Sequence, residues 1–367
     1  MTGTTDTGVL AVGTGGGDGS SPGVRTDATG AAAPPLPRSS EEHDAHFMAR
    51  AVANADAVRG STAPNPWVGA VVVSDEGELF DGATQPQRGP HAEVEAVQAA
   101  DSRARGATLY TTLEPCSHQG HNPPCVEAIV AAGVRRVVLG MSDPDPLVNG
   151  RGTAMLRAAG IEVTTGCAEA TVRRQLAPYV KHRTTGRPWV VLKLAASLDG
   201  RTAAPDSSSK WITGPDARRD AHRLRARCDA VLVGAGTARA DDPALTVRGV
   251  RGSDPQRIVL GRAPADAKIH PCWELSGELG DVLDELGGRG VIDLLVEGGA
   301  QVAAALHNGG FVDEYIVYLG PVLFGGSDGH PVFEGPGAPT IDDVWRGHVD
   351  DVAKIGSDIR VRMLRET

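Results

Sequence analysis

The chain has 367 residues, 41% of them hydrophobic and 22% charged, with a formal net charge of −10. This length predicts about two domains, each large enough to bury a core. The acidic balance argues against non-specific binding to nucleic acid or an anionic membrane, and no apolar run approaches the roughly 20 residues that span a bilayer. No secretory signal pattern is found, and the odd count of five cysteines favours a reducing compartment, so we expect a cytoplasmic protein.

Residues 1–40 differ in composition from the rest of the chain. Runs of glycine, alanine and proline at 15–17 and 31–37 offer too little apolar surface to offset the entropy lost on ordering. We predict a disordered tail without catalytic function. A partner-binding segment is the alternative, although nothing in the tail supports it specifically.

Helix-like and strand-like stretches alternate from about residue 41. Helices are expected over 41–59, 91–100, 125–132 and 168–182, and strands over 68–73, 107–113 and 134–141. Prolines stand directly before the second and third of these helices, where they favour a helix start. The alternation predicts a layered α/β domain.

His91, Glu93, Cys116 and Cys125 form the most informative pattern in this first half. One imidazole and two thiolates supply three zinc ligands and leave the fourth tetrahedral position open for water. A water bound there ionises near neutral pH, and Glu93 can then carry protons without binding the metal. Zinc deaminases use this grouping, although here the cysteines are nine residues apart rather than three. The alternative is that the cysteines serve as small buried hydrophobic residues.

Both His91 and Cys125 are predicted to open a helix, where exposed backbone amides favour negative charge. These amides should lower the thiolate pKa of Cys125 and so favour metal binding. An activated water would then attack an amidine-like ring carbon while Glu93 passes a proton to the leaving amine. The pattern does not indicate which ring is the substrate.

The second half predicts another α/β layer, with buried strands over 190–194, 230–234, 257–260 and 292–296. The segment 184–188 separates the halves, so we place the domains at 41–186 and 187–367. Glycines 234, 236, 298 and 299 follow strands, where small residues let amides approach a phosphate. The dinucleotide-binding fingerprint fails because Arg239 takes its third glycine position, and plain tight turns explain the glycines equally well.

Motifs in both halves, read in order, give a more specific indication. The first half contains APNPWVG at 63–69, PHAEV at 90–94, TLEPCSH at 112–118, PPC at 123–125 and DPDP at 143–146. The second contains KLAASLDGRT at 193–202, WIT at 211–213, ARRD at 217–220, LR at 224–225, GT at 236–237, ADDPAL at 240–245, Arg248 and LVEGG at 295–299. Over roughly 45–320, with a weaker match at 357–364, the chain resembles the bifunctional riboflavin-biosynthesis deaminase–reductases.

This resemblance implies a cytidine-deaminase-like zinc domain followed by a dihydrofolate-reductase-like domain. It also implies Zn²⁺ and NADPH as cofactors, a phosphorylated diaminopyrimidinone as substrate, reduction of its ribosyl group to ribityl, and a homo-oligomer.

The resemblance also assigns residues to roles. Asn65 would contact the pyrimidine in the deaminase half. The reductase cofactor positions are Ala195, Trp211, Thr237, Asp241 and Gly299, and the substrate positions are Ser209, Thr213, Arg225, Leu245, Arg248 and Glu297. Lys193 and Asp199 are candidates for holding ribose hydroxyls or relaying a proton. The alternative for Asp199 is that it forms a structural salt bridge. The alternative for any single arginine is that it is a solvated surface charge.

Three positions depart from the pattern that the family usually shows. Thr84 stands in place of a histidine, His121 in place of a lysine or arginine, and Asp145 in place of an asparagine. All three are expected near the substrate, so they predict a competent zinc centre with altered substrate recognition. One alternative is a reductase whose degenerate deaminase domain holds a structural zinc. A non-catalytic nucleotide-binding or regulatory protein is the other, and the retained Glu93 argues against it.

Overall fold

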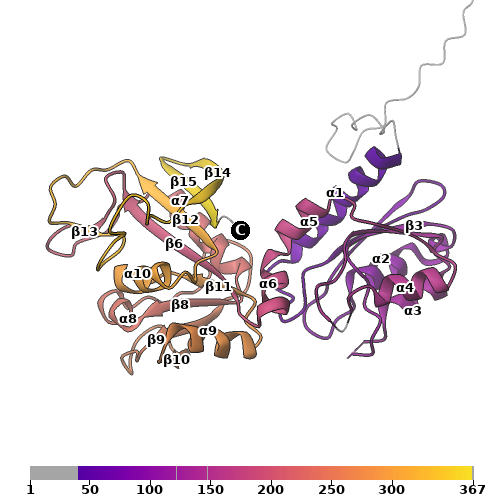
Figure 1. Ribbon diagram of the computed structural model, residues 1–367, viewed down its shortest axis with the longest axis horizontal. Coiled ribbons are helices and arrows are strands. Elements are labelled where there is room, and N and C mark those ends of the chain that lie inside the picture. Colours follow the sequence, from indigo (N-terminus) through magenta and orange to yellow (C-terminus); the bar gives the residue numbers. More distant parts are fainter. Residues whose placement is uncertain (1–39, 121, 147, 366–367) are drawn as a thin grey trace, which may run out of the picture. The chain divides into compact units, whose positions relative to one another are not determined.

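The computed structural model describes residues 40–120, 122–146 and 148–365 (Figure 1). The tail predicted over 1–40 lies outside the described residues except for Ser40, and so does His121. The chain divides into a unit over residues 1–43 and a unit over residues 44–367, and all described residues except 40–43 belong to the second. Among the described residues, no helix is both long enough and apolar enough to cross a membrane.

Six α-helices and five strands make up the first half of the described chain. In order they are α1 (Ser40–Val58), β1 (Gly69–Val73), β2 (Leu79–Ala83), α2 (Ala92–Ala100), the short 3₁₀ helix η1 (Asp101–Ala104), β3 (Thr108–Leu113), α3 (Cys125–Ala132), β4 (Arg136–Met141), α4 (Arg151–Ala158), β5 (Glu162–Thr165), α5 (Glu169–Gln175) and α6 (Ala177–Thr185). The strands form one sheet in the order β2-β1-β3-β4-β5. Strand β1 is antiparallel to both of its neighbours, whereas β3, β4 and β5 are parallel.

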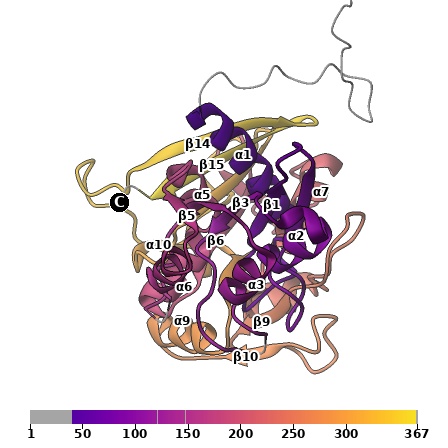
Figure 2. The ribbon, with the colours of Figure 1, turned by 90° about the vertical axis from the view of Figure 1, so that its right-hand side faces the viewer.

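Two glycines show that α1 and α2 cover opposite faces of this sheet. Ala70 and Gly82 are paired across two strands, so a Cβ at either position points to the same face of the sheet. Gly69 precedes Ala70, so a Cβ at Gly69 would point to the opposite face. A Cβ at Gly69 would lie 1.9 Å from the carbonyl oxygen of Ala51 in α1, and one at Gly82 would lie 2.1 Å from that of Ala92 in α2. The missing side chains therefore let both helices approach the strands closely, and Figure 2 shows the two helices on either side of β1.

The second half is built on an eight-stranded sheet. Its elements are β6 (Trp189–Ser197), β7 (Arg201–Ala203), α7 (Pro215–Arg227), β8 (Ala230–Gly234), α8 (Ala235–Asp241), β9 (Gln256–Leu260), β10 (Trp273–Leu275), α9 (Leu279–Gly288), β11 (Asp293–Val296), α10 (Ala300–Asn308), β12 (Glu314–Gly320), β13 (His330–Pro331), β14 (Gly347–Ile355) and β15 (Asp358–Arg365). The strand order is β10-β9-β8-β11-β6-β12-β15-β14, and β7 pairs separately with β13. From β10 to β12 neighbouring strands are parallel, and β15 and β14 complete the sheet with antiparallel pairs.

The register of the central strands determines which residues meet at one edge of this sheet. Val296 at the end of β11 pairs with Leu192 in β6 and with Leu232 in β8. The following residues, Glu297 and Lys193, therefore lie level with each other. In parallel sheets, ligands bind beyond the carboxyl ends of the strands, where such residues gather.

The predicted elements agree with the observed ones except near the end of the first half. The helix expected over 168–182 is divided at Leu176 into α5 and α6. Pro178 lies in the first turn of α6, and because proline has no backbone N–H it cannot continue a helix that began before it. The domain junction expected between residues 186 and 187 lies between the end of α6 at Thr185 and the start of β6 at Trp189. This boundary stays a prediction.

Candidate active sites: a metal centre and a charged cleft

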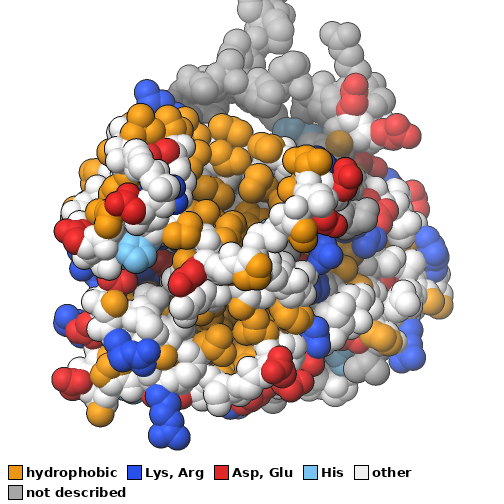
Figure 3. All heavy atoms as spheres, turned by 60° about the vertical axis from the view of Figure 1, so that its left-hand side comes forward, with side chains coloured by type: hydrophobic (Ala, Val, Ile, Leu, Met, Phe, Trp, Pro, Cys, Tyr) orange, Lys and Arg blue, Asp and Glu red, His pale blue; other side chains and the backbone are white. Residues whose placement is uncertain are grey.

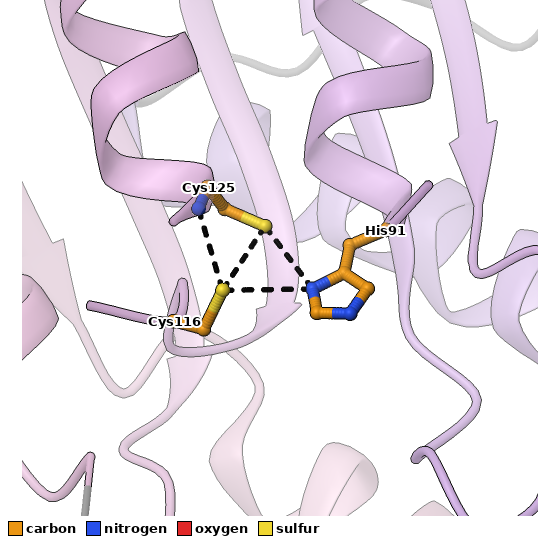
Figure 4. Close-up of side chains that lie close together, drawn as sticks. All are labelled: His91, Cys116 and Cys125. Atoms are coloured by element: carbon orange, nitrogen blue, oxygen red, sulfur yellow. Dashed lines mark hydrogen bonds between the residues drawn. The ribbon is translucent and has the colours of Figure 1, made fainter. Parts of the chain in front are cut away.

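His91, Cys116 and Cys125 bring three metal-binding atoms together (Figure 4). The Nδ1 atom of His91 lies 3.2 Å from the Sγ atom of Cys125 and 3.6 Å from that of Cys116, and the two sulfur atoms are 3.4 Å apart. Zinc bonds of about 2.0 Å to nitrogen and 2.3 Å to sulfur, at tetrahedral angles, separate such atoms by about 3.5–3.8 Å. The three side chains therefore fit one zinc ion with little adjustment.

The ligands converge because two helices start beside the end of a strand. His91 is the N-cap of α2, Cys125 is the first residue of α3, and Cys116 lies in the loop after β3. The backbone amide of Cys125 donates a hydrogen bond to the Cys116 sulfur over 3.3 Å. The start of α3 thus faces Cys116. The position of Cys116 in the sequence, in the loop after β3, did not predict this contact.

The expectation of a lowered Cys125 pKa was wrong. Hydrogen bonds that the Cys116 sulfur accepts from Cys125 and from His91 lower the pKa of Cys116 to about 4. The shared proton with Cys116 and burial, together with the nearby Glu93 carboxylate, raise the pKa of Cys125 instead. The amide at the start of α3 therefore favours negative charge on the Cys116 sulfur, to which it donates a hydrogen bond.

Glu93 is the buried carboxylate of this site, with 3% of its surface exposed in the first turn of α2. Burial raises its pKa to about 7, although the charge of His91 opposes the shift. A carboxyl group with a pKa near neutrality can both accept and return a proton.

A cavity of about 140 Å³ adjoins the metal-binding atoms. The predicted substrate-side residues Asn65, Thr84 and Asp145 line it together with Glu93. Thr84 is buried, and its hydroxyl accepts a hydrogen bond from the Val68 amide over 3.1 Å.

Two cavity residues on α6, Tyr179 and Arg183, were missed at the sequence level. The Tyr179 hydroxyl donates to the Asp143 carboxylate over 3.1 Å, and the Arg183 Nε atom lies 3.6 Å from the Asp145 carboxylate. The Arg183 guanidinium also lies over the Tyr179 ring, 5.1 Å from its centre. Their four-residue spacing on one helix was the available signal.

Glu114, inside the TLEPCSH motif, holds the loop that carries Asp143 and Asp145. Its buried carboxylate accepts hydrogen bonds from the backbone amides of Asp143, Gly150 and Thr153 over 3.3, 2.9 and 2.9 Å. One side chain thus fixes both ends of this loop beside the metal-binding atoms.

A larger cleft of about 590 Å³ lies at the carboxyl ends of the parallel strands in the second half. Its charged centre is Glu297, which receives hydrogen bonds from the Nε and Nη2 atoms of Arg225 over 2.5 and 3.0 Å. The Lys193 Nζ atom lies 3.6 Å from the same carboxylate. Burial opposes ionisation of Glu297, but the charges of Lys193 and Arg225 outweigh it and lower the pKa to about 2. Arg225 and Lys193 thus outnumber the one carboxylate that they contact, while Asp241 and Glu334 add negative charge elsewhere along the cleft.

Comparisons with known proteins connect both sites to one family. Residues 41–141 match the cytidine and deoxycytidylate deaminase zinc-binding region, and residues 188–361 match the RibD C-terminal domain. The riboflavin biosynthesis protein RibD of Escherichia coli (strain K12) is 37% identical over 364 residues, which cover 88% of this chain and 99% of that protein. The chain belongs to the RibD family.

Another RibD and two solved structures agree with this assignment. RibD of Mycobacterium tuberculosis (strain ATCC 25618 / H37Rv) is 39% identical over 332 residues, or 86% of this chain and 96% of that protein. Acinetobacter baumannii RibD (form 1) superposes with a TM-score of 0.83 at 37% identity, covering 89% of this chain and 100% of that one. A diaminohydroxyphosphoribosylaminopyrimidine deaminase/5-amino-6-(5-phosphoribosylamino)uracil reductase of Thermotoga maritima gives 0.80 at 32% identity, with 89% and 99% covered. The predicted fold class is therefore confirmed, and this RibD chain has both a zinc-binding deaminase domain and a reductase domain.

Most of the residues predicted for the reductase half of this RibD chain do gather at its cleft. The cleft and its continuation are lined by Lys193, Ala195, Ser209, Arg225, Thr237, Asp241, Leu245, Glu297 and Gly299. Strand β6 supplies Lys193 and Ala195, whereas Thr237 and Asp241 follow β8, and Glu297 and Gly299 follow β11.

Four predicted residues lie elsewhere. Arg248 is exposed and donates to the Thr246 hydroxyl over 3.1 Å, and the Thr213 carbonyl accepts from Arg218 over 2.6 Å. Asp199 is exposed and accepts from the Ser197 hydroxyl and the Gly325 amide, which makes it an anchor for the following loop. None of these three lines the cleft or its continuation.

Trp211 is the fourth, and it lies on an exposed apolar surface. It is 68% exposed and shares a shallow depression with Ser209 and the segment 322–324. Figure 3 shows the face on the β13 side of Figure 1, where hydrophobic side chains gather near the centre.

The glycines of the reductase half have two different reasons to be small. A Cβ at Gly234 or Gly298 would come within 2.8 Å of the Val302 side chain in α10, so both glycines are required by helix packing. Gly236 has open space around it, and Gly299 is the N-cap of α10. Only at Gly236 and Gly299 does the prediction remain that a small residue lets a phosphate approach the backbone amides.

Proposed function

We propose that this RibD chain carries out two successive reactions on one phosphorylated pyrimidine. The deaminase half hydrolyses an amino group from 2,5-diamino-6-(5-phosphoribosylamino)pyrimidin-4-one. The reductase half then reduces the ribosyl group to ribityl with NADPH. The observation that carries the proposal is the zinc-compatible triangle of His91, Cys116 and Cys125 beside a buried, uncoordinated Glu93.

In the deaminase half, Glu93 is the proton carrier. A zinc ion held by His91, Cys116 and Cys125 supplies Lewis-acid activation of a water molecule. Glu93 accepts a proton from that water and later delivers it to the leaving amine. The ring carbon gains an oxygen, its bond to nitrogen breaks, and ammonia departs.

The surrounding cavity orients the pyrimidine. Asn65 offers an amide that can both donate and accept hydrogen bonds with the ring. Cationic groups near the opening, Arg183 in this cavity and Arg88 in the adjoining one, suit the substrate phosphate. Asp145, which pairs with Arg183, adds a negative charge where the family usually has asparagine.

In the reductase half, the charged group of Glu297, Arg225 and Lys193 holds the sugar. NADPH, when bound, supplies the hydride that adds to the ribosyl C1′ carbon. Ring opening comes first: the ring oxygen takes a proton, leaves C1′ and becomes a hydroxyl, while the lone pair of the attached nitrogen forms the C1′=N double bond to which the hydride would add. We assign Lys193 to these oxygens because its ammonium group lies on the cleft and is held by the Glu297 carboxylate. Ala195, Thr237, Asp241 and Gly299 form the cofactor side, with Ser209 and Leu245 on the substrate side.

A measurement of both products in one preparation tests this function. Zinc-loaded protein, given the diaminopyrimidinone phosphate and NADPH, should release one ammonia and oxidise one NADPH for each substrate consumed. Chelated protein should lose ammonia release but still oxidise NADPH when given the already deaminated substrate. Absence of turnover with that substrate would refute the reductase assignment.

One structural observation favours a second candidate, a reductase with an inactive deaminase domain. The Asp145 carboxylate lines the deaminase cavity and forms an ion pair with Arg183. The Arg183 guanidinium is therefore less available to bind a substrate phosphate. Full zinc occupancy with an active reductase but without ammonia release would establish that candidate. The cytoplasmic location and the homo-oligomeric state, expected from the sequence, stay predictions.

A further inference from the structure

A second cluster of metal-binding side chains lies on the segment that leads into β10. His270, Cys272 and Glu274 alternate along the chain, and their ligand atoms all lie within 4.8 Å of one another. Trp273 points the other way, where it packs against the core and lies under the Arg289 guanidinium at 4.6 Å. Within residues 40–120, 122–146 and 148–365, only this cluster and the one at His91 meet that distance condition.

The orientation of His270 is that of a metal ligand. Its Nε2 atom lies 2.9 Å from the carbonyl oxygen of Pro264. A carbonyl oxygen only accepts hydrogen bonds, so Nε2 carries the proton and Nδ1 keeps its lone pair. Metal-binding histidines are commonly oriented in this way, by a backbone carbonyl that binds the other ring nitrogen.

The remaining donor atoms are placed to share an ion with that lone pair. The His270 Nδ1 atom lies 3.5 Å from the Cys272 sulfur, and a tetrahedral zinc site separates such atoms by about 3.5 Å. The backbone amide of Ala263 donates to one oxygen of Glu274 over 2.9 Å, which holds the carboxylate next to the other two side chains. The cluster is partly exposed, so an ion can reach it from solvent.

We propose that His270, Cys272 and Glu274 form a second site for a divalent transition-metal ion, separate from the deaminase centre. Nitrogen, sulfur and oxygen donors together suit Zn²⁺, whereas Mg²⁺ and Ca²⁺ prefer oxygen ligands alone. Three protein ligands leave the fourth position to water.

The site has a structural use in the reductase half. Lys268, in the turn that the ion would hold, donates its amide to the Asp242 carboxylate over 2.7 Å and forms an ion pair with it over 2.8 Å. Asp242 follows Asp241, which lines the reductase cleft. A metal ion at His270 would therefore fix the turn that braces the end of α8.

Zinc stoichiometry of the full-length, tag-free protein tests the proposal. After saturation with Zn²⁺ and removal of free ion by gel filtration, the unmodified chain should hold two zinc ions. C272S should hold one, and C116S should also hold one. C167S, which changes another free, partly exposed cysteine outside both clusters, should still hold two. One zinc in the unmodified chain, or two in C272S, would overturn the proposal.

A spectroscopic measurement covers the case in which a variant folds poorly. In C116S/C125S, which lacks the deaminase sulfurs, added Co²⁺ should give a near-ultraviolet thiolate charge-transfer band of one-sulfur intensity. Adding C272S should abolish the band while NADPH oxidation with the deaminated substrate continues, which shows that the reductase half is folded. A Co²⁺-loaded C116S/C125S protein without this band, or one that keeps it after C272S, would contradict the second site.

Discussion

Glu93 in the deaminase half is buried and Glu297 in the reductase half is partly buried, with 9% of its side chain exposed, yet their surroundings shift their pKa values in opposite directions. Burial dominates at Glu93 and raises its pKa to about 7. Burial opposes ionisation at Glu297 too, but Lys193 and Arg225 lower its pKa to about 2. Local charge thus suits the same side chain to carry protons in one site and to remain a fixed anion in the other.

The two sites also differ in how the chain encodes them. The metal ligands His91 and Cys125 are 34 residues apart and depend on two helix starts beside one strand. Arg225 and Glu297 are 72 residues apart and meet because α7 packs beside the end of β11. A local substitution should therefore remove the first site alone, whereas the second depends on correct packing of the whole sheet.

The largest expected effect separates the two halves completely. C116S removes one zinc ligand, and because Lewis-acid activation contributes several kcal/mol, ammonia release should fall at least about a thousandfold. NADPH oxidation with the deaminated substrate should be unchanged. C167S serves as the control and should retain both activities. Equal losses in both assays for C116S would show that the halves do not act independently.

Truncating Glu297 should impair the reductase half, just as C116S impairs the deaminase half. E297A leaves Arg225 and Lys193 without their carboxylate in a buried site, which should lower the free energy of unfolding by about 3–5 kcal/mol and abolish NADPH oxidation. E285A, which breaks the exposed pair between Glu285 and Arg289, should cost about 0–1 kcal/mol. Urea unfolding followed in parallel measures both. A loss for E297A no greater than for E285A would show that the charged group contributes little to stability.

The pH dependence of stability should report Glu297 directly. Its pKa is about 2 in the folded chain, against the ordinary glutamate value of 4.5 that applies once the chain unfolds, so its contribution is complete above pH 4.5 and disappears as pH falls towards 2. The difference of about 2.5 pKa units corresponds to about 3 kcal/mol. Urea midpoints of the unmodified chain and E297Q should converge as pH falls through this range. A constant gap between them down to pH 2 would rule out the lowered pKa.

Asp145→Asn should have the smallest effect, confined to deaminase binding. Restoring the residue that the family usually has removes a carboxylate from the substrate cavity and frees Arg183 for the phosphate. One charged hydrogen bond of about 1.4 kcal/mol corresponds to a KM about tenfold lower, with kcat unchanged. D75N, which changes the exposed pair of Asp75 with Arg135, is the control. A higher KM for D145N would mean that Asp145 is needed to orient Arg183.

The metal centre was predictable because its residue types are specific and close in sequence. Each ligand stands beside a proline or a helix start, so its local structure follows from its own neighbours. The reductase group was predicted only through the family resemblance, since no local pattern links Arg225 to Glu297. Only the strand register and the packing of α7 explain their meeting.

Other features needed three-dimensional information. The α3 amide points at Cys116 rather than stabilising Cys125, which depends on how the loop after β3 folds back. Gly234 and Gly298 are small because the Val302 side chain packs against both. This contact was not evident from the sequence, in which Val302 follows them by four residues or more. The break before Pro178, by contrast, was readable from proline chemistry alone.

Substitution of Glu93 by glutamine is the most direct test of the account, with E95Q from the same helix turn as the control. Zinc content should remain that of the unmodified chain, and NADPH oxidation with the deaminated substrate should persist. Ammonia release should fall about 10²–10⁴-fold in E93Q and stay unchanged in E95Q. Normal ammonia release by zinc-loaded E93Q would contradict the assignment of Glu93 as the proton carrier.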